Sequence, residues 1–246
     1  MKRSETIEIM QHHTSVRHFK DEKIPREDFI EIIKATQGAA SSHFIQAYSI
    51  IHVTDEQKRK QIMECANNQK QIINCSDFLV FCCDYKRLEH VCRKYDIEIE
   101  FAHLESFIMT VVDTSLIAQN TLTAAESLGY GGCYIGGIRN NIEQVSHILE
   151  LPDKVFPLFG MTLGIPSESN EVKPRLPIEA ILHENTYNEE NYPEILDAYD
   201  QVMTEYYSLR SANTKDTNWT KEMAHFFKDK RRMHMKEFIA SKGFDV

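Results

Sequence analysis

Residues 104–128 constrain the fold more than any other segment, because they combine helical spacing with apolar side chains on most sides of the helix. A helix of this kind has to be covered by other elements, so we expect it to be central and buried. Gly129 follows directly, and glycine commonly ends helices. The apolar positions are Phe107, Ile108, Val111, Val112, Leu116, Ile117 and Leu122.

Four short β-rich runs lie before and after this helix, and helical stretches separate them. Helical spacing also marks two helices within the first forty residues and one at residues 141–151, which Pro152 follows. This arrangement predicts a layered fold of the α/β or α+β class. The β-rich runs cover residues 48–53, 78–83, 133–135 and 155–163.

The sequence divides after residue 166. Residues 1–166 form the predicted α+β core, and residues 167–190 are polar and proline-containing, as expected of a long ordered loop. Residues 192–246 regain helical spacing, with a polar interruption at 211–218. Because such a tail cannot bury its apolar face alone, we expect residues 167–246 to pack on the core and on a second subunit, giving a homodimer.

Charge and cysteine content exclude several classes of protein. With 28 basic and 37 acidic residues the formal charge is −9, which disfavours nucleic-acid binding. The first ten residues carry no apolar signal segment, and Asp113 interrupts the least charged stretch, so we expect neither secretion nor a membrane span. The six cysteines form no CxxC pair and the histidines have no ligand spacing, so we expect reduced thiols, no metal site and a cytoplasmic location.

Glycine is concentrated in one place. Five of the nine glycines lie in residues 129–137, directly after the long helix. Glycine permits positive φ and close backbone approach, so the segment is either a ligand-binding loop or a structural turn. It is not a dinucleotide-binding fingerprint, because a helix rather than a strand precedes it.

Three polar clusters offer binding groups. His13, Ser15 and Arg17 alternate, so an extended backbone would place them on one face, although Arg17 could instead pair with Asp21 or Glu22. Pro174 stiffens the segment that carries Lys173 and Arg175, and two fixed cations suit a phosphate. Residues 41–46 offer hydroxyl and amide groups that could bind a planar polar ligand or only cap a turn.

Together these residues resemble the nitroreductase family, in its oxygen-insensitive NADPH nitroreductase and NADPH-flavin reductase branch. The resemblance runs in order over essentially the whole chain. It implies an α+β homodimer with a central mixed β-sheet flanked by helices and one FMN at each subunit interface. The segments that carry it are His13-x-Ser15-Val16-Arg17, Ser41-Ser42-x-Phe44-x-Gln46, Gln69-Lys70, Gly132-x-Tyr134-Ile135-Gly136-Gly137 and Lys173-Pro174-Arg175.

The resemblance also implies a role for each residue. The FMN phosphate and ribityl chain would be held by His13, Ser15, Arg17, Lys173 and Arg175. Ser41, Ser42 and Gln46 would reach the same flavin from the other subunit, and Gln69 would bind its pyrimidine edge. Tyr134, Ile135, Gly136 and Gly137 would line the ring, with peptide N–H groups near its reactive nitrogen.

NADPH would be bound by Arg210 and Lys215 in the tail, and Lys215 stands where related proteins often carry arginine. Asn67-Asn68 likewise replaces glycines that often precede the equivalent of Gln69.

The implied activity is a ping-pong, two-electron reduction of nitroaromatics, quinones, flavins or similar acceptors, with NADPH as donor and the chemistry carried by FMN rather than by a catalytic side chain. Two alternatives remain. One is a flavin-storage module without efficient turnover. The other is a flavin-coupled disulfide reductase that uses Cys82, Cys83 or Cys133.

Overall fold

The computed structural model describes residues 4–210 and 214–246, and the chain divides into two compact units. The first unit contains residues 4–170 and 232–246, and the second contains residues 171–231. Residues 232–246, which the sequence placed with the tail, therefore belong to the first unit. The reason is burial, since Phe238, Ile239 and Phe244 lie in a hydrophobic cluster with Phe156 of the core.

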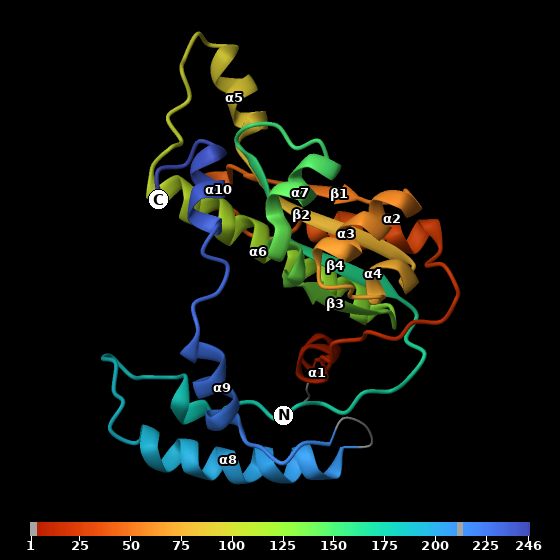
Figure 1. Cartoon of the computed structure of the whole chain (residues 1–246), viewed down its shortest axis with the longest axis vertical. Coiled ribbons are helices and arrows are strands. Elements are labelled where there is room, and N and C mark those ends of the chain that lie inside the picture. The colour runs from red at the N-terminus through yellow and green to blue at the C-terminus, as the bar shows by residue number, and fades with distance from the viewer. Residues whose placement is uncertain (1–3, 211–213) are drawn as a thin grey trace. The chain divides into compact units, whose positions relative to one another are not determined.

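A four-stranded sheet forms the centre of the first unit (Figure 1). Its order is β1-β2-β4-β3, and all three pairings are antiparallel. The mixed sheet implied by the resemblance is therefore not found in these strands; the parallel pairing in the described part of the chain is an isolated bridge from Ser15 to Gly132. The strands fall where the sequence predicts them: β1 (Tyr48–His52), β2 (Asp77–Asp84), β3 (Gly131–Ile135) and β4 (Val155–Gly164).

Helices cover both faces of this sheet (Figure 1). On β2, Phe78, Val80 and Cys82 face one hydrophobic cluster, whereas Leu79 and Phe81 face another, as the alternation of a strand requires. The first cluster is covered by α3 (Glu56–Cys65), α4 (Gln71–Asn74) and α7 (Ile142–Ile148), and the second by α2 (Arg26–Thr36) and α6 (Leu104–Ser127). The other helices of this unit are α1 (Glu5–Gln11), α5 (Lys86–Arg93) and α10 (Met235–Ser241).

Helix α6 differs from the sequence prediction of a helix buried on most sides. Its buried face carries small polar residues, including Thr110, Asp113, Thr114 and Thr121, each 0% exposed. The opposite face is apolar and open in the single chain. Leu104, Ile108, Val112 and Leu116, at four-residue spacing, are 56%, 45%, 47% and 41% exposed. We call these four residues the α6 stripe.

The second unit is largely helical and has a small core of its own. It contains α8 (Tyr192–Leu209), α9 (Trp219–Lys228) and a short 3-10 turn (Ile178–Ala180). Its core comprises Tyr199, Met203 and Tyr207 of α8, against which Leu176 and Trp219 pack. This part of the tail therefore buries some of its apolar surface itself, although residues such as Phe227 stay 77% exposed.

Candidate functional site

The segment that carries His13, Ser15 and Arg17 runs beside strand β3. Val16 N donates to Gly132 O at 2.9 Å, and Val16 is 4% exposed. A β-carbon at Gly131 would lie 2.5 Å from Val16 Cγ2, so Gly131 is needed for this close packing. With Val16 turned inward, Ser15 and Arg17 lie on the outer side of the segment.

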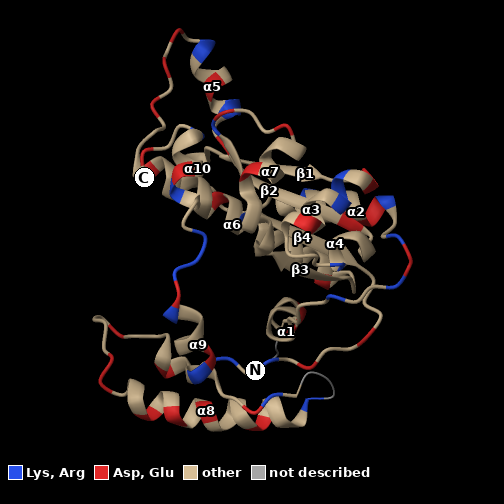
Figure 2. Cartoon of the chain, viewed as in Figure 1, with Lys and Arg blue, Asp and Glu red and all other residues tan. Residues whose placement is uncertain are grey.

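Arg17 is an exposed cation beside an uncharged strand, because β3 and its neighbour β4 carry no charged residue (Figure 2). Within residues 4–210 and 214–246 it makes no ion pair, so the alternative of a pair with Asp21 or Glu22 is not found. Its charge acts on Cys133, where it opposes the burial that raises the pKa of that thiol. Arg17 is therefore available to an anionic ligand.

His13 is bound by a carboxylate of α6. Its Nδ1 lies 2.5 Å from Glu126 Oε1 on α6, which holds the ring against the first unit and leaves Nε2 unbonded among the described groups. The only hydrogen bond that the structure describes for Ser15 is between its carbonyl and Asn170 Nδ2, at 3.5 Å. The Ser15 hydroxyl therefore has no partner within the described residues.

The glycines of residues 129–137 meet two different structural requirements, a left-handed backbone and close packing. Gly129 has φ +84°, the left-handed conformation expected where a helix ends. Gly136 and Gly137 follow β3 without positive φ, in a 3-10 turn (Gly136–Asn141). A β-carbon at Gly137 would overlap Gln69 Nε2 and lie 3.2 Å from Ala66 O. Gly137 is thus required so that the Gln69 amide can lie against the backbone.

Gln69 is presented by an unusual backbone. Asn67 and Asn68 have φ +56° and +58°, a region that asparagine tolerates better than most residues other than glycine. Glycine adopts this conformation at the least cost, which gives a physical reason for the glycines that the resemblance implies at these positions. Gln71 Nε2 donates to Gln69 Oε1 at 3.1 Å, which fixes the orientation of the Gln69 amide.

Tyr134 and Ile135 point to opposite sides of β3. Ile135 is 0% exposed and lies in a core cluster, so only its backbone can face a ligand there. Tyr134 is half-buried, with its ring edge-on to Phe159 and its hydroxyl 3.5 Å from Gln119 Oε1. Burial raises the pKa of the Tyr134 phenol, which stays protonated at neutral pH.

Ser41, Ser42 and Gln46 lie in the segment before β1, at the opposite edge of the sheet from β3. Strands β2 and β4 stand between, which amounts to roughly 14 Å at about 4.8 Å per strand. The Ser41 hydroxyl donates to Asp113 Oδ2 at 2.7 Å, whereas the Ser42 hydroxyl has no partner within the described residues. Within one chain these residues do not meet Gln69 or Gly137.

The cationic residues of the second unit are held against its own helices. Lys173 Nζ lies 5.3 Å from the centre of the Tyr207 ring, and the Tyr199 hydroxyl donates to Pro174 O at 2.8 Å, which fixes the segment that carries Arg175. Arg210 lies 5.7 Å from the Tyr206 ring. That Lys173 and Arg175 act together with Arg17 stays a prediction.

Lys215 is engaged by a carboxylate, since its Nζ lies 3.2 Å from Glu222 Oε2. Residues 211–213 of the polar interruption lie outside the described residues.

The cysteines do not form a redox centre in this structure. All six are free thiols. Burial raises the pKa of Cys75 to about 11 and of Cys83 to about 12, and that of Cys82 well above its usual value. Reactive cysteines have depressed pKa values, so these thiols are unsuited to attack a disulfide.

Within residues 4–210 and 214–246, His, Cys, Asp and Glu side chains nowhere form a group of three or more that could hold a metal ion. None of the described helices is long and apolar enough to cross a membrane.

The helices and the four-stranded sheet define an α+β protein, and solved structures of nitroreductase-family enzymes share its fold. The structure of the NADPH:FMN oxidoreductase from Vibrio harveyi complexed with NAD+ superimposes with a TM-score of 0.88 at 39% identity, covering 98% of this chain and 99% of that one. Residues 10–165 match the nitroreductase family and residues 173–246 match the nitroreductase family, C-terminal domain. The chain belongs to the nitroreductase family.

Two relatives extend this similarity over nearly the whole chain. The Cr(VI) reductase of Pseudomonas sp. (strain G-1) is 48% identical over 97% of this chain and 98% of its own. The oxygen-insensitive NADPH nitroreductase of Salmonella typhimurium is 40% identical over 98% of both chains.

FMN fits the residues that the structure brings to β3. An exposed, unpaired guanidinium and an unbonded hydroxyl, from Arg17 and Ser15, are suitable groups for a phosphate and its ribityl chain. The Gln69 amide can both donate to and accept from the edge of a ring, and the backbone at Gly137 admits it without a clash. Sequence reasoning missed Asp113, which organises Ser41 and Ser42, because a lone acidic residue in a helix gives no signal of its partners.

Proposed function

We propose that this chain is an FMN-dependent NADPH oxidoreductase that reduces nitroaromatics, quinones, flavins and similar acceptors by two electrons. The observation that carries the proposal is that the segment of Ser15 and Arg17 pairs with β3 while the Gln69 amide rests on Gly137 in the turn that follows β3. Its support from comparison is the family membership over residues 10–165 and 173–246 and the similarity to enzymes named for NADPH and FMN.

The protein's own part in the reaction is to bind and orient. Arg17 and Ser15 would hold the phosphate and ribityl groups, joined by His13 of the same segment. FMN, when bound, supplies hydride acceptance from NADPH and two-electron transfer to the acceptor.

Gln69 would bind the edge of the flavin ring, because its amide is oriented by Gln71 and rests on Gly137. The peptide N–H groups at Gly136 and Gly137 could donate to negative charge that develops on the flavin ring. Tyr134 and the backbone of Ile135 would line the same side of the ring.

A homodimer accounts for two features that a single chain leaves without purpose. The α6 stripe exposes four large apolar residues at regular spacing, as expected of a surface covered by another subunit. Ser42 and Gln46 lie at the sheet edge opposite β3, so they would reach a flavin bound at β3 from another copy of the chain. We therefore place one FMN at each subunit interface.

NADPH binding is assigned to Arg210 and Lys215. Both are cations in the second unit, and a 2′-phosphate would compete with Glu222 for Lys215. The relative named as a Cr(VI) reductase adds chromate to the acceptors that this protein should be tested against. Six free cysteines and the use of NADPH fit a cytoplasmic enzyme.

The decisive experiment is the visible absorption spectrum of the purified protein, recorded without oxygen before and after NADPH. We expect a flavin spectrum that bleaches with NADPH and returns on addition of a quinone, a nitroaromatic or chromate. A flavin spectrum that persists with NADPH would identify a storage module instead. A colourless protein that FMN does not reconstitute would overturn the cofactor assignment.

A further inference from the structure

Residues 41–47, the segment between α2 and β1, have a backbone conformation that costs free energy. His43, Phe44 and Gln46 have φ values of +47°, +59° and +51°, and none of the three is a glycine. Left-handed backbone is unfavourable for bulky side chains and persists only where the surroundings impose it. Phe44 is also 80% exposed, so its own packing in this chain does not supply the restraint. Something else has to hold this segment.

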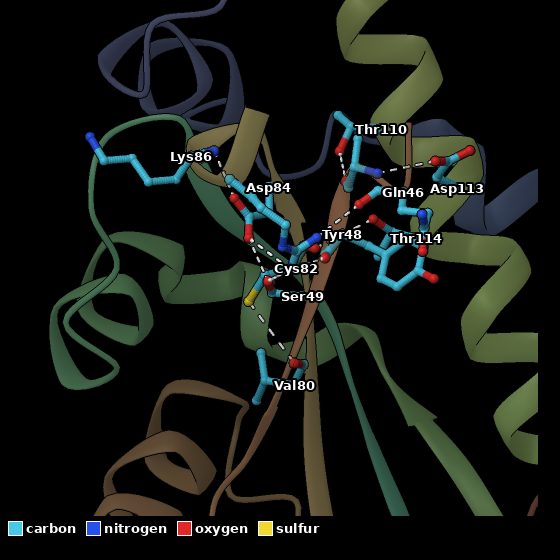
Figure 3. Close-up of polar contacts among 12 residues, drawn as sticks. Gln46, Tyr48, Ser49, Val80, Cys82, Asp84, Lys86, Thr110, Asp113 and Thr114 are labelled. Atoms are coloured by element: carbon cyan, nitrogen blue, oxygen red, sulfur yellow. Dashed lines mark hydrogen bonds and ion pairs between the residues drawn. The ribbon is translucent and has the colours of Figure 1, made fainter. Parts of the chain in front are cut away.

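Asp113 supplies that restraint from helix α6. Its side chain is 0% exposed and makes no ion pair within residues 4–210 and 214–246. One carboxylate oxygen accepts from Ser41 Oγ at 2.7 Å and from Ala47 N at 3.2 Å, and the other accepts from Ser42 N at 3.0 Å. A single buried carboxylate therefore binds both ends of the segment. Figure 3 shows it pointing from α6 toward the chain between Gln46 and Tyr48.

Other hydrogen bonds also stabilise residues 41–47, but none of them takes the place of those made by Asp113. Ser41 Oγ also accepts from Gln46 N at 2.8 Å, which folds the segment back on itself. Thr110, one turn before Asp113 on α6, donates to Ala47 O (Figure 3). Arg87 Nη1 donates to Gln46 O at 3.1 Å from the solvent side. Among the residues that the structure describes outside the segment, Asp113 alone hydrogen-bonds both of its ends, and a buried charge of this kind is costly unless its hydrogen bonds are made.

We propose that Asp113 is a positioning residue for flavin binding, and that it acts by holding residues 41–47 in the conformation that presents Ser42 and Gln46 to the cofactor of the partner subunit. This inference rests on the proposed function. The Ser41 hydroxyl then stabilises the segment by its hydrogen bonds to Asp113 and Gln46. The Ser42 hydroxyl makes no hydrogen bond within the described residues and could bind the flavin. The hydrogen bonds of Asp113 compensate the strain of the left-handed residues in this segment.

The test compares Asp113→Asn with wild type by two measurements that do not depend on turnover. The first is hydrogen exchange at the amides of Ser42 and Ala47, both of which donate to Asp113. The second is the FMN dissociation constant from flavin fluorescence. Asparagine has the same size but only one accepting oxygen. We expect exchange at both amides to speed up about tenfold or more and FMN binding to weaken about tenfold or more.

The matched control is Thr121→Val, two turns further along α6. Thr121 is also 0% exposed, and its hydroxyl bonds Thr36 at 2.8 Å rather than residues 41–47. This variant should lose thermal stability while leaving FMN affinity and the exchange of Ser42 and Ala47 as in wild type. Ser41→Ala, which removes one of the three hydrogen bonds to Asp113 together with the bond from Gln46 N, should shift both measurements in the same direction, and it serves if Asp113→Asn does not fold.

The outcomes separate this inference from the proposed function. Faster exchange together with weaker FMN binding supports a positioning role. Wild-type exchange, or faster exchange with unchanged FMN affinity, overturns it and leaves Asp113 with a structural role only. If wild-type protein itself binds no FMN, the proposed function fails and the flavin role of Asp113 fails with it, while the exchange data still decide whether Asp113 holds the segment.

Discussion

The side-chain amide of Gln69 occupies the space that a β-carbon at Gly137 would need. The two residues come from different elements, one from the turn after α3 and the other from the turn after β3. Glycine at position 137 therefore serves the close approach of the two residues rather than an unusual φ.

Gly137→Ala should therefore displace Gln69 and weaken FMN binding about tenfold or more, because the amide loses its place at the ring edge. The measurement is the FMN dissociation constant from fluorescence. Gly129→Ala is the control: it strains a residue at φ +84° where nothing lies within 4 Å, so it should lower the melting temperature and leave FMN affinity as in wild type. Equal FMN affinity in Gly137→Ala would contradict the role of this contact.

Arg17→Ala should weaken FMN binding by about 10- to 100-fold, since it removes a charge-assisted contact to phosphate. Riboflavin lacks the phosphate, so its affinity should change little. The matched variant is Lys20→Ala, which removes an exposed cation three residues further on. Equal losses for FMN and riboflavin would show that Arg17 acts through the fold instead of the phosphate.

Val112→Asp places a charge in the middle of the α6 stripe, where Val112 is 47% exposed in the single chain. Burying an unpaired carboxylate in an interface is costly, so we expect the dimer dissociation constant to rise about 100-fold. Sedimentation at several concentrations measures it, and FMN should be lost along with the dimer. Gln57→Asp, on the exposed side of α3, should leave the dimer intact. A monomeric wild type would refute the interface.

Lys215→Ala should raise KM for NADPH about tenfold and leave KM for NADH unchanged, because only NADPH carries the 2′-phosphate. Glu222→Gln should act in the opposite direction, since it removes the carboxylate 3.2 Å from Lys215 Nζ. Lys221→Ala removes an exposed cation from α9 and serves as the control. Steady-state kinetics measure KM for NADPH and for NADH in each variant. Parallel changes in the two values would exclude a contact to the 2′-phosphate.

Stability at low pH should depend on Glu89. Hydrogen bonds from Lys86 and then from Lys154 lower the pKa of Glu89 from 4.5 to about 2. A lowered pKa in the folded state means stabilisation that is complete above about pH 4.5 and is lost as the pH falls toward 2.

Glu89→Gln should therefore melt at a lower temperature than wild type at about pH 7, and the difference should shrink between about pH 4.5 and pH 2. Thermal unfolding over that range measures it. Glu150→Gln, which breaks a pair between Lys58 and an 82% exposed carboxylate, should change little. A difference that does not vary with pH would show that Glu89 stabilises by packing alone.

Much of the fold could be predicted from local pattern. The four strands and the long helix lie within a few residues of their predicted bounds, because alternation and helical spacing are properties of neighbouring residues. The family resemblance likewise depended on short motifs in order along the chain. What the pattern misjudged was α6, since apolar residues predict burial without saying whether the same chain or another covers them.

The candidate site likewise combines features that follow from local sequence with features that depend on the folded chain. The functional groups proposed to bind the flavin could be identified from the amino-acid sequence. They are the cation of Arg17, the amide of Gln69 and the glycines at 136 and 137. Three contacts are visible only in the tertiary structure: Val16 packs on Gly131, Gln69 rests on Gly137, and Asp113 hydrogen-bonds residues 41–47. The reason is physical, because these contacts join residues far apart along the chain, and their distances exist only once the sheet and α6 are assembled.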